Sequence, residues 1–384
     1  MEKMKVAIVH DWLTTYGGAE TFVELWLTMY PGAEIFTLVH DRKGMEGHFG
    51  NSTIHTSRMQ RVPFATRLYR KLLAFMPRAF ESFDLSGFDL VLCSSSCCAK
   101  GVIVPPHVPH IAYIHTPMRY AWDLYFDYRA RSGALTRFFM DRWMGGIRLW
   151  DYVSAQRIDT VVANSRYIAR RIKKFWNRDA AVIYSPLNTA RFFDDPSVPR
   201  EDFYVTYSRF VPYKRIDIAI EAVRGSGRTL VVIGAGPEEK RLKSLARGDR
   251  NIVFAGRLPD GELRRNLQRC RAMIFCAEED FGLAPLEAQA CGAPVVAFAR
   301  GGAAETVIDG KTGVFFAEQS AESLRGALAR FEELHGRGAF AHDAIVSQAK
   351  SFSAERFKRE FARIVEETRA KIAAGAGGAD EARR

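Results

Sequence analysis

The sequence predicts an α/β protein with two Rossmann-like domains, each built on a doubly wound parallel sheet, that face each other across a cleft. Three observations support this fold class. Short apolar runs alternate with amphipathic helical patterns, as in parallel sheets covered by helices. The alternation occurs twice, on either side of a loop-like stretch at residues 188–200. The length of 384 residues, with 47% hydrophobic and 26% charged residues, suits two or three globular domains.

The first half begins with an apolar run from Met4 to Val9 that leads through a Gly17-Gly18 turn into an amphipathic stretch. This order indicates a strand, a glycine loop and a helix. Further strands are expected at residues 35–39, 90–93, 102–104, 110–114, 161–162 and 181–184. We therefore assign residues 1–185 to an N-terminal domain.

The second half repeats the pattern after the loop-like stretch. Strands are expected at residues 203–207, 230–233, 252–254, 272–275 and 294–298, with helices at 215–224, 238–246, 260–270 and 283–291. Residues 186–353 thus form a C-terminal domain. The remaining segment, 354–384, should contain a helix to about residue 373 that packs back on the N-terminal domain, followed by a frayed Gly/Ala-rich tail from Gly375.

Composition excludes several classes of protein. The six cysteines show no spacing typical of a metal site, so we expect reduced, mostly buried thiols and no bound metal. No apolar run approaches the roughly 20 residues of a membrane-spanning helix, and none indicates a secretory signal. A cytoplasmic chain is therefore expected.

The net charge of +11 is concentrated in the first half, where residues 1–185 hold 24 Lys and Arg against 16 Asp and Glu. The stretch from Arg58 to Arg78 contains six basic residues and no acid, interleaved with aromatic and aliphatic side chains. This mixture is typical of contact with an anionic membrane surface, and it recurs at 129–148 and 166–178. Solvated helix faces are the alternative interpretation. Nucleic acid is not an expected partner because no recognition motif accompanies the charge.

Two loops carry groups that suit phosphate. Gly17-Gly18 opens a predicted helix, where backbone N–H groups and the helix dipole favour anions, although two glycines can also form a simple turn. Arg209 and Lys214 follow the predicted strand at 203–207, and together they could neutralise a diphosphate leaving group. The similar Gly234-Ala235-Gly236-Pro237 loop is interpreted as a structural turn.

The most informative segment runs from Glu278 to Ala290, where three acids precede a Phe-Gly turn and an apolar helix start. Glu279 and Glu287 are eight residues apart, so one can lie at the loop and the other one to two helical turns further along, facing the same cleft. One carboxylate could hold sugar hydroxyls and the other a ribose. An acidic helix start is the alternative.

Over nearly its whole length, the chain resembles the family 4 glycosyltransferases of the GT-B fold. The paired-glutamate motif of that family, Glu-x7-Glu, is matched by Glu279 and Glu287, and its Arg-x4-Lys pair by Arg209 and Lys214. The family's first glycine loop corresponds to Gly17-Gly18, and its N-domain histidine to His115.

This resemblance implies retaining transfer of a sugar from a nucleoside diphosphate sugar to a hydroxyl acceptor, without a cofactor. The N-terminal domain would bind the acceptor and the C-terminal domain the nucleotide sugar. The implied catalytic residues are His115, Glu279, Arg209 and Lys214. The implied donor-binding residues are Gly17, Gly18, Arg209, Lys214, Gly256, Arg257, Leu258, Glu279, Phe281, Gly282, Leu283, Ala284 and Glu287.

The implied roles differ within this set. Arg209 and Lys214 would hold the diphosphate, Glu287 the ribose and Glu279 the sugar hydroxyls. The backbone of 281–284 would face the sugar and phosphates, and the loop at 256–258 would border the base. His115 would lie near the reacting sugar, although an isolated histidine of this kind can also be structural.

The segments 115–123, 213–217 and 278–282 are similar to those of bacterial mannosyltransferases of O-antigen and exopolysaccharide assembly. This likeness implies GDP-mannose as the donor, a lipid-linked saccharide as the acceptor, and peripheral association with the inner face of the cytoplasmic membrane. Asp280 stands where many members of the wider family have Gly, which agrees with this subgroup.

Several alternatives remain open at this point. They are a UDP-sugar-dependent transferase, a nucleotide-sugar epimerase of the same fold, and an inactive subunit that only binds a sugar nucleotide. A dinucleotide oxidoreductase is disfavoured because the first strand leads to no Gly-x-Gly-x-x-Gly turn. The chain has no Asp-x-Asp triplet, so we expect the reaction to proceed without a metal ion.

Overall fold

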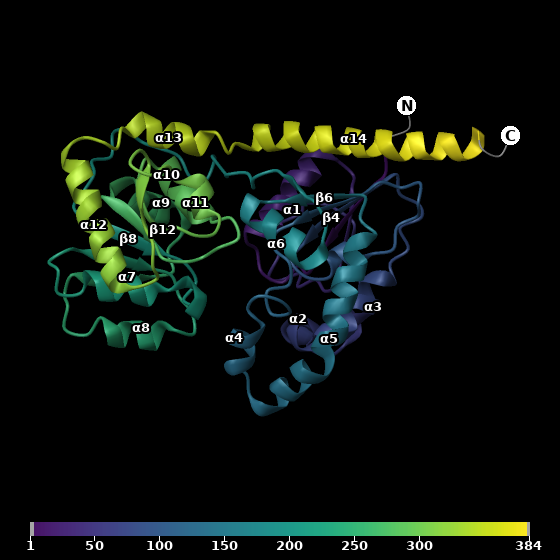
Figure 1. The fold of residues 1–384 in the computed structure, drawn as a ribbon, viewed down its shortest axis with the longest axis horizontal. Helices are drawn as coiled ribbons and strands as arrows, with labels where there is room; N and C mark the ends of the chain where they lie inside the picture. Colours follow the sequence, from purple (N-terminus) through teal and green to yellow (C-terminus); the bar gives the residue numbers. More distant parts are fainter. Residues whose placement is uncertain (1–3, 382–384) are drawn as a thin grey trace. The chain divides into compact units, whose positions relative to one another are not determined.

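The computed structural model describes the backbone of residues 4–381 and the burial of residues 4–374. The described chain divides into two compact units (Figure 1). Unit 1 holds the residues up to Tyr184 together with those from Lys358 onward, and unit 2 runs from Ser185 to Phe357. Each unit has its own hydrophobic core.

Unit 1 contains a seven-stranded parallel sheet in the order β3-β2-β1-β4-β5-β6-β7. Its strands are β1 (Val6–His10), β2 (Glu34–Thr37), β3 (Ile54–Thr56), β4 (Leu90–Ser95), β5 (His110–Ile114), β6 (Thr160–Ala163) and β7 (Ala181–Val182). The central strands β1, β4 and β5 are buried along their whole length, which explains their apolar character. The strand order reverses between β1 and β4, so the loops after these strands diverge and leave room for a ligand.

The helices of unit 1 lie on both faces of this sheet. They are α1 (Gly18–Met29), α2 (Ala65–Leu68), α3 (Met76–Glu81), α4 (Tyr125–Ala130), α5 (Ala134–Gln156), α6 (Arg166–Trp176) and α14 (Ala354–Glu381), with the 3-10 turns η1 (Arg58–Arg61), η2 (Tyr69–Phe75) and η3 (Ala99–Gly101). The basic run at 58–78 is therefore a series of short helical pieces.

Unit 2 contains a six-stranded parallel sheet in the order β10-β9-β8-β11-β12-β13. Its strands are β8 (Tyr204–Tyr207), β9 (Leu230–Ile233), β10 (Ile252–Gly256), β11 (Ala272–Phe275), β12 (Val295–Phe298) and β13 (Gly313–Phe316). Its helices are η4 (Pro212–Lys214), α7 (Ile216–Val223), α8 (Glu239–Leu245), α9 (Asp260–Arg269), α10 (Leu283–Ala290), α11 (Ala303–Thr306), α12 (Ala321–Gly336) and α13 (His342–Lys350). This order is that of a dinucleotide-type Rossmann sheet, with its reversal between β8 and β11. The expected class, two doubly wound parallel sheets, is confirmed.

Some expected elements need correction. The strand expected at 102–104 is absent, because Pro105 and Pro106 follow directly and cannot donate to a sheet. The sequence patterns also missed β3 and β13. The Gly/Ala-rich stretch expected to be frayed is helical as far as Glu381, and residues 382–384 lie outside the described part of the chain.

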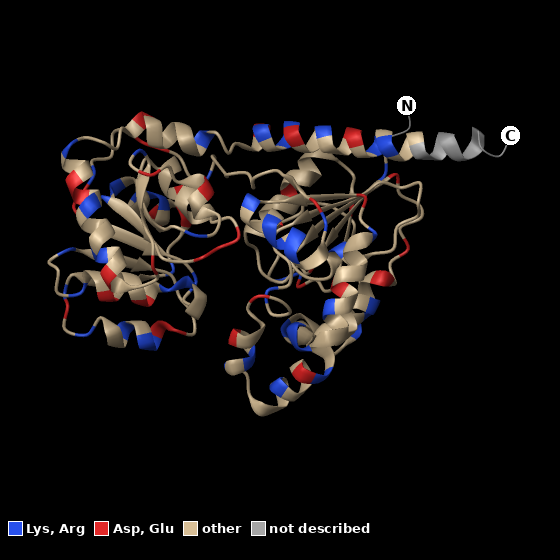
Figure 2. Cartoon of the chain, viewed as in Figure 1, with Lys and Arg blue, Asp and Glu red and all other residues tan. Residues whose placement is uncertain are grey.

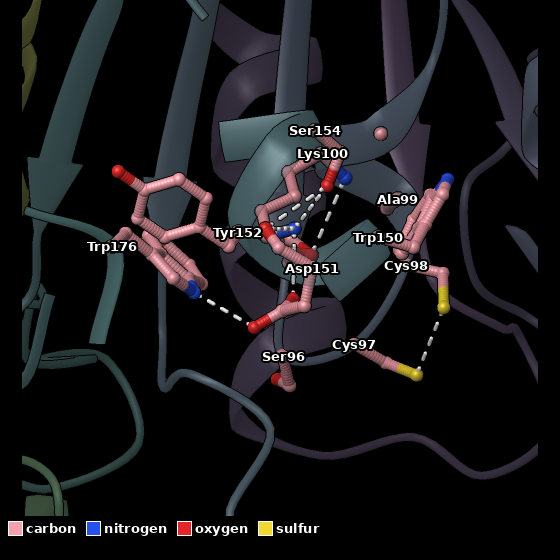
Figure 3. A network of polar contacts seen from close by, with 12 residues as sticks. Ser96, Cys97, Cys98, Ala99, Lys100, Trp150, Asp151, Tyr152, Ser154 and Trp176 are labelled. Atoms are coloured by element: carbon pink, nitrogen blue, oxygen red, sulfur yellow. Dashed lines mark hydrogen bonds and ion pairs between the residues drawn. The ribbon is translucent and has the colours of Figure 1, made fainter. Parts of the chain in front are cut away.

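A buried ion pair connects α5 to the loop that follows β4 (Figure 3). The Lys100 ammonium lies 2.9 Å from Asp151 Oδ1, and both side chains are at most 1% exposed. Lys100 also donates to Ser154 Oγ at 2.8 Å. Trp122 and Trp176 donate their indole N–H groups to Asp151 Oδ2 at 2.8 and 2.7 Å. The second half of α5 is thereby held rigidly against the loop that follows β4.

The six cysteines are all free and buried, as predicted. Among the described helices, none is both long enough and apolar enough to cross a bilayer.

Candidate functional site

The reversal point of the unit 2 sheet brings two predicted site residues into direct contact. Lys214 ends η4, which follows β8, and Glu279 lies in the loop that follows β11. Because β8 and β11 are neighbouring parallel strands, their carboxyl ends meet at one edge of the sheet. The Lys214 ammonium forms an ion pair with Glu279 Oε1, and both side chains are less than a fifth exposed. The pair therefore places one positive and one negative group at the carboxyl edge of the unit 2 sheet.

Arg209 supplies a second cation on the same side. It follows β8 by two residues and is exposed, and its guanidinium makes no hydrogen bond or ion pair with a described residue. A fork of N–H donors that is left free at the end of a parallel strand is suited to bind a phosphate or a carboxylate.

Glycine loops from neighbouring strands support these two segments. A Cβ at Gly234 would lie 1.9 Å from Ser208 O, and one at Gly236 would lie 2.4 Å from Phe210 O. The Phe210 N–H donates to Ala235 O at 2.9 Å. These contacts support the structural interpretation of the Gly234–Gly236 loop, since only glycine permits so close an approach to the Arg209 segment.

A second glycine pair, Gly301-Gly302 after β12, supports the loop that carries Glu279, and sequence reasoning missed it. The Gly302 N–H donates to Glu279 O at 2.8 Å. A Cβ at Gly301 would lie 2.4 Å from the same carbonyl oxygen, and one at Gly302 would lie 2.2 Å from Phe281 O. Two consecutive glycines three residues after the end of the predicted strand at 294–298 were the signal that could have indicated this role.

The turn into α10 presents a helix N-terminus beside the ion pair. Gly282 is the N-cap with a φ of +80°, a conformation that favours glycine, and Leu283 and Ala284 form the first turn. Phe281 is 4% exposed and packs against Phe352 at a centroid distance of 6.0 Å. The anchored Phe281 ring and the glycine N-cap thus fix the start of α10, whose first N–H groups favour an anion.

Glu287 lies on α10 and is partly buried. Desolvation raises the pKa of Glu287 to about 7, although the nearby Arg191 guanidinium acts to lower it. A carboxyl group with this pKa can be either protonated or ionised near neutral pH.

The third predicted loop lies at the end of an outer strand. Gly256 ends β10 with a φ of +68°, Arg257 is exposed and Leu258 is partly buried. One strand, β9, separates β10 from β8. These residues therefore lie at the same edge of the sheet as the ion pair, two strands away from β8.

In unit 1, the predicted residues flank the reversal point of the other sheet. Gly17 is the N-cap of α1 and Gly18 its first residue, and both are exposed. His115 follows β5, is partly exposed, and contacts Ser94 at the end of β4. Burial lowers the pKa of His115 to about 3, so its imidazole is neutral at neutral pH.

Asp11 is another residue to which sequence reasoning assigned no role. Its carboxylate accepts four backbone hydrogen bonds at 2.5 to 2.9 Å, from the N–H groups of Ser96, Cys97, Cys98 and Ala99. These bonds and the neighbouring His10 lower the pKa of Asp11, but burial outweighs them and raises it. Asp11 thereby fixes the loop after β4, which adjoins the Ser94 and His115 pair.

Comparison with known proteins identifies the family. A family model described as glycosyl transferases group 1 matches residues 189–347. A second model, described as Glycosyltransferase Family 4, matches residues 16–191. The chain belongs to glycosyltransferase family 4.

Curated relatives match this chain over part of its length. A GDP-mannose-dependent alpha-(1-6)-phosphatidylinositol monomannoside mannosyltransferase of Mycolicibacterium smegmatis is 34% identical over 185 residues, 40% of this chain and 48% of that protein. A D-rhamnosyltransferase of Pseudomonas aeruginosa is 32% identical over 136 residues, 34% of this chain and 35% of that protein. An uncharacterized glycosyltransferase of Methanocaldococcus jannaschii is 26% identical over 170 residues, 44% of this chain and 48% of that protein. The chain spans about half the length of the curated relatives it matches first.

Solved structures match over nearly the whole chain. The Anabaena protein HepE, solved in complex with UDP, has a TM-score of 0.71 at 18% identity and covers 95% of this chain and 100% of its own. A sucrose-phosphate synthase from Thermosynechococcus elongatus has a TM-score of 0.72 at 16% identity and covers 96% of this chain and 100% of its own. These likenesses show the fold, which is GT-B.

Proposed function

We propose that this protein transfers a sugar, with retention of configuration, from a nucleoside diphosphate sugar to a hydroxyl acceptor. The observation that carries the proposal is the group at the reversal point of the unit 2 sheet: a free guanidinium at Arg209, the Lys214–Glu279 ion pair and the N-terminus of α10. Positive groups at this position suit a diphosphate, and a carboxylate beside them suits sugar hydroxyls.

The chemistry follows from these charges. Arg209 and Lys214 stabilise the negative charge that develops on the departing diphosphate, so no side chain needs to attack the sugar. The bond from the anomeric carbon to the phosphate oxygen breaks, the bond to the acceptor oxygen forms on the same face, and the acceptor proton passes to the phosphate oxygen. Glu279 holds sugar hydroxyls, Glu287 holds the ribose, and the loop at 256–258 borders the base. His115, Gly17 and Gly18 contribute to sugar and phosphate binding from unit 1.

GDP-mannose is the proposed donor, and a lipid-linked oligosaccharide of surface polysaccharide assembly is the proposed acceptor. The sequence similarity to GDP-mannose-dependent mannosyltransferases supports the donor. A UDP-sugar is the second candidate, because the GT-B structure of HepE was solved with UDP. An epimerase would convert the donor without an acceptor, and an inactive subunit would bind the donor without turnover.

A donor screen that follows GDP or UDP release, with and without a lipid-linked acceptor, tests this assignment. We expect acceptor-dependent release of GDP from GDP-mannose and an unchanged rate after chelation of divalent ions. Release of UDP alone, conversion without acceptor, or a strict metal requirement would each contradict the corresponding part of the proposal.

Replacement of Lys214 by Ala or Glu279 by Gln should lower kcat roughly 100- to 1,000-fold, because each removes a group that stabilises charge or grips the sugar. Lys243→Ala is the matched control, since Lys243 forms a surface ion pair with Glu239 on α8. Circular dichroism confirms folding of each variant. Near-normal rates for Lys214→Ala and Glu279→Gln would remove both residues from the site.

The proposed membrane contact involves α5 and the basic run at 58–78. The buried residues of α5 begin at Met144, so its first half projects from the core. Leu135 and Phe138 are 71% and 63% exposed there, and Phe64 is 71% exposed beside α2. The helices α2 and α6 carry basic residues and no acid (Figure 2). Apolar side chains among cations are suited to bind an anionic bilayer.

Charge reversal tests this contact. Replacement of Arg67, Arg70 and Lys71 by Glu should lower cosedimentation with phosphatidylglycerol vesicles at least tenfold, because each basic residue contributes about 1 kcal/mol at an anionic surface. The same reversal at Lys240, Lys243 and Arg247 in unit 2 is the control. Equal loss in both variants would indicate a net-charge effect, and unchanged binding would leave the basic run as solvated surface.

A further inference from the structure

A chain of buried polar contacts lies behind His115 in unit 1. Glu20 Oε1 lies 3.4 Å from His10 Nε2, and His10 Nδ1 lies 3.1 Å from Ser94 Oγ. Ser94 Oγ lies 2.9 Å from His115 Nε2. Glu20, His10 and Ser94 are 7%, 3% and 0% exposed. Because water has little access to them, the protons of these groups must be shared within the chain.

The direction of each hydrogen bond depends on whether His10 carries one proton or two. A carboxylate only accepts, so His10 donates its Nε2–H to Glu20. If this is the one proton on His10, its Nδ1 atom accepts the hydroxyl proton of Ser94. The Ser94 oxygen then accepts from His115, which carries its proton on Nε2.

Glu20 begins this chain of contacts at the start of α1. It lies in the first turn of α1, three residues after the N-cap Gly17, where the helix dipole stabilises negative charge. A Cβ at Gly17 would lie 3.3 Å from Glu20 Oε2, closer than most such contacts. The glycine therefore leaves room for the carboxylate that begins the chain of contacts.

The other nitrogen of His115 is free to meet a ligand. Its Nδ1 atom has no hydrogen bond to a described residue and is not among the buried polar atoms that lack a partner, so it reaches the surface. The rings of Phe22 and Tyr113 stand edge-on to the imidazole, each with a centroid distance of 5.3 Å. These rings and the Ser94 contact hold the imidazole in one orientation.

We propose that Glu20, acting through His10 and Ser94, holds His115 with its proton on Nε2, so that Nδ1 accepts a hydrogen bond from a hydroxyl of the sugar substrate. Glu20, His10 and Ser94 are positioning residues in this arrangement. The sugar as ligand rests on the proposed function, whereas the protonation pattern of His115 rests on the contacts of unit 1 and on a singly protonated His10.

Nitrogen-15 spectra of the full-length protein with labelled histidine report which ring nitrogen carries the proton. We expect His115, assigned by loss of its signals in His115→Gln, to show a protonated Nε2 and an unprotonated Nδ1. In Ser94→Ala and Glu20→Ala, the nitrogen-15 chemical shifts of Nδ1 and Nε2 of His115 should move toward each other, because both tautomers become populated. Glu34→Ala is the matched control, since it removes the carboxylate partner of His55 in the same sheet. It should leave His115 unchanged.

The proposal fails if wild-type His115 carries its proton on Nδ1, or if Ser94→Ala, folded by circular dichroism, leaves its shifts unchanged. Kinetics provide the second measurement. Ser94→Ala should lower kcat by on the order of tenfold or more with the dissociation constant for GDP unchanged, since the other tautomer carries a proton on Nδ1 and cannot accept the hydrogen bond of the sugar hydroxyl. If the spectra are as expected but the protein transfers no sugar, the proposed function is wrong, whereas the positioning roles of Glu20, His10 and Ser94 are supported.

Discussion

Glu287 is the residue whose titration the structure ties most directly to stability. Burial raises its pKa to about 7 from an ordinary value of 4.5. Between these two values the folded state keeps a proton that the unfolded chain has lost. This contribution to stability is therefore fully present below about pH 4.5 and is lost as the pH rises through 7.

We predict that Glu287→Gln raises the free energy of unfolding at pH 8 by about 1–3 kcal/mol, because Gln resembles the protonated carboxyl group. Urea unfolding at pH 4 and pH 8 measures the effect, which should nearly vanish at pH 4, where the carboxyl group is largely protonated in both the folded and the unfolded state. Glu239→Gln, on the surface of α8, is the control. A variant that is less stable than wild type at pH 8 would show that the ionised carboxylate is favourably paired.

The buried Lys100–Asp151 pair is one of the contacts that attach α5 to the rest of unit 1. Lys100→Met should destabilise the protein by about 3–5 kcal/mol, because it leaves the Asp151 carboxylate buried with no cation beside it. The double variant with Asp151→Asn should recover part of this loss. Lys173→Met, which breaks an exposed pair with Asp179, should cost less than about 1 kcal/mol. Urea unfolding measures the free energy of unfolding of all three variants. Equal losses of stability for Lys100→Met and Lys173→Met would show that the buried pair contributes no more than an exposed one.

Elements were predictable from the sequence where apolar runs were long and bounded by turn residues. The strands β9 and β11 appear at the expected residues because each is a compact, mostly buried apolar run. In contrast, β13 begins with Gly313. A Cβ added at this position would lie 2.0 Å from Val295 O. A glycine required by close packing looks like a turn in sequence, so this strand was missed. The half-buried β3 has only three residues and no apolar run.

The site was predictable to a similar extent. Motif spacing located Lys214 and Glu279, and neighbouring strand ends explain why they meet. Spacing could not show that Gly302 binds the carbonyl of Glu279, or that His10 and Ser94 connect Glu20 to His115. Such partners are set by which strands pair in space, and the sequence alone leaves that pairing undetermined.

The division of the chain into two units brings a distant segment into the first core. Phe361 on α14 is fully buried, and its ring lies 5.1 Å from that of Trp26 on α1. Thr368 on the same helix hydrogen-bonds Thr160 at the start of β6, at 2.7 Å. Unit 1 therefore needs α14 to complete its core, although more than 170 residues of unit 2 intervene in the sequence.

We predict that Phe361→Ala destabilises unit 1 by about 3–5 kcal/mol, because a fully buried ring leaves a cavity. Hydrogen exchange followed by mass spectrometry should show faster exchange in β1, β4 and β6, with β8 and β11 unchanged. Phe331→Ala is the matched control, since Phe331 is equally buried in the core of unit 2 and should give the reverse pattern. If either variant accelerates exchange in both sheets, the two units unfold as one. The α14 helix would then stabilise the whole molecule rather than the unit on which it packs.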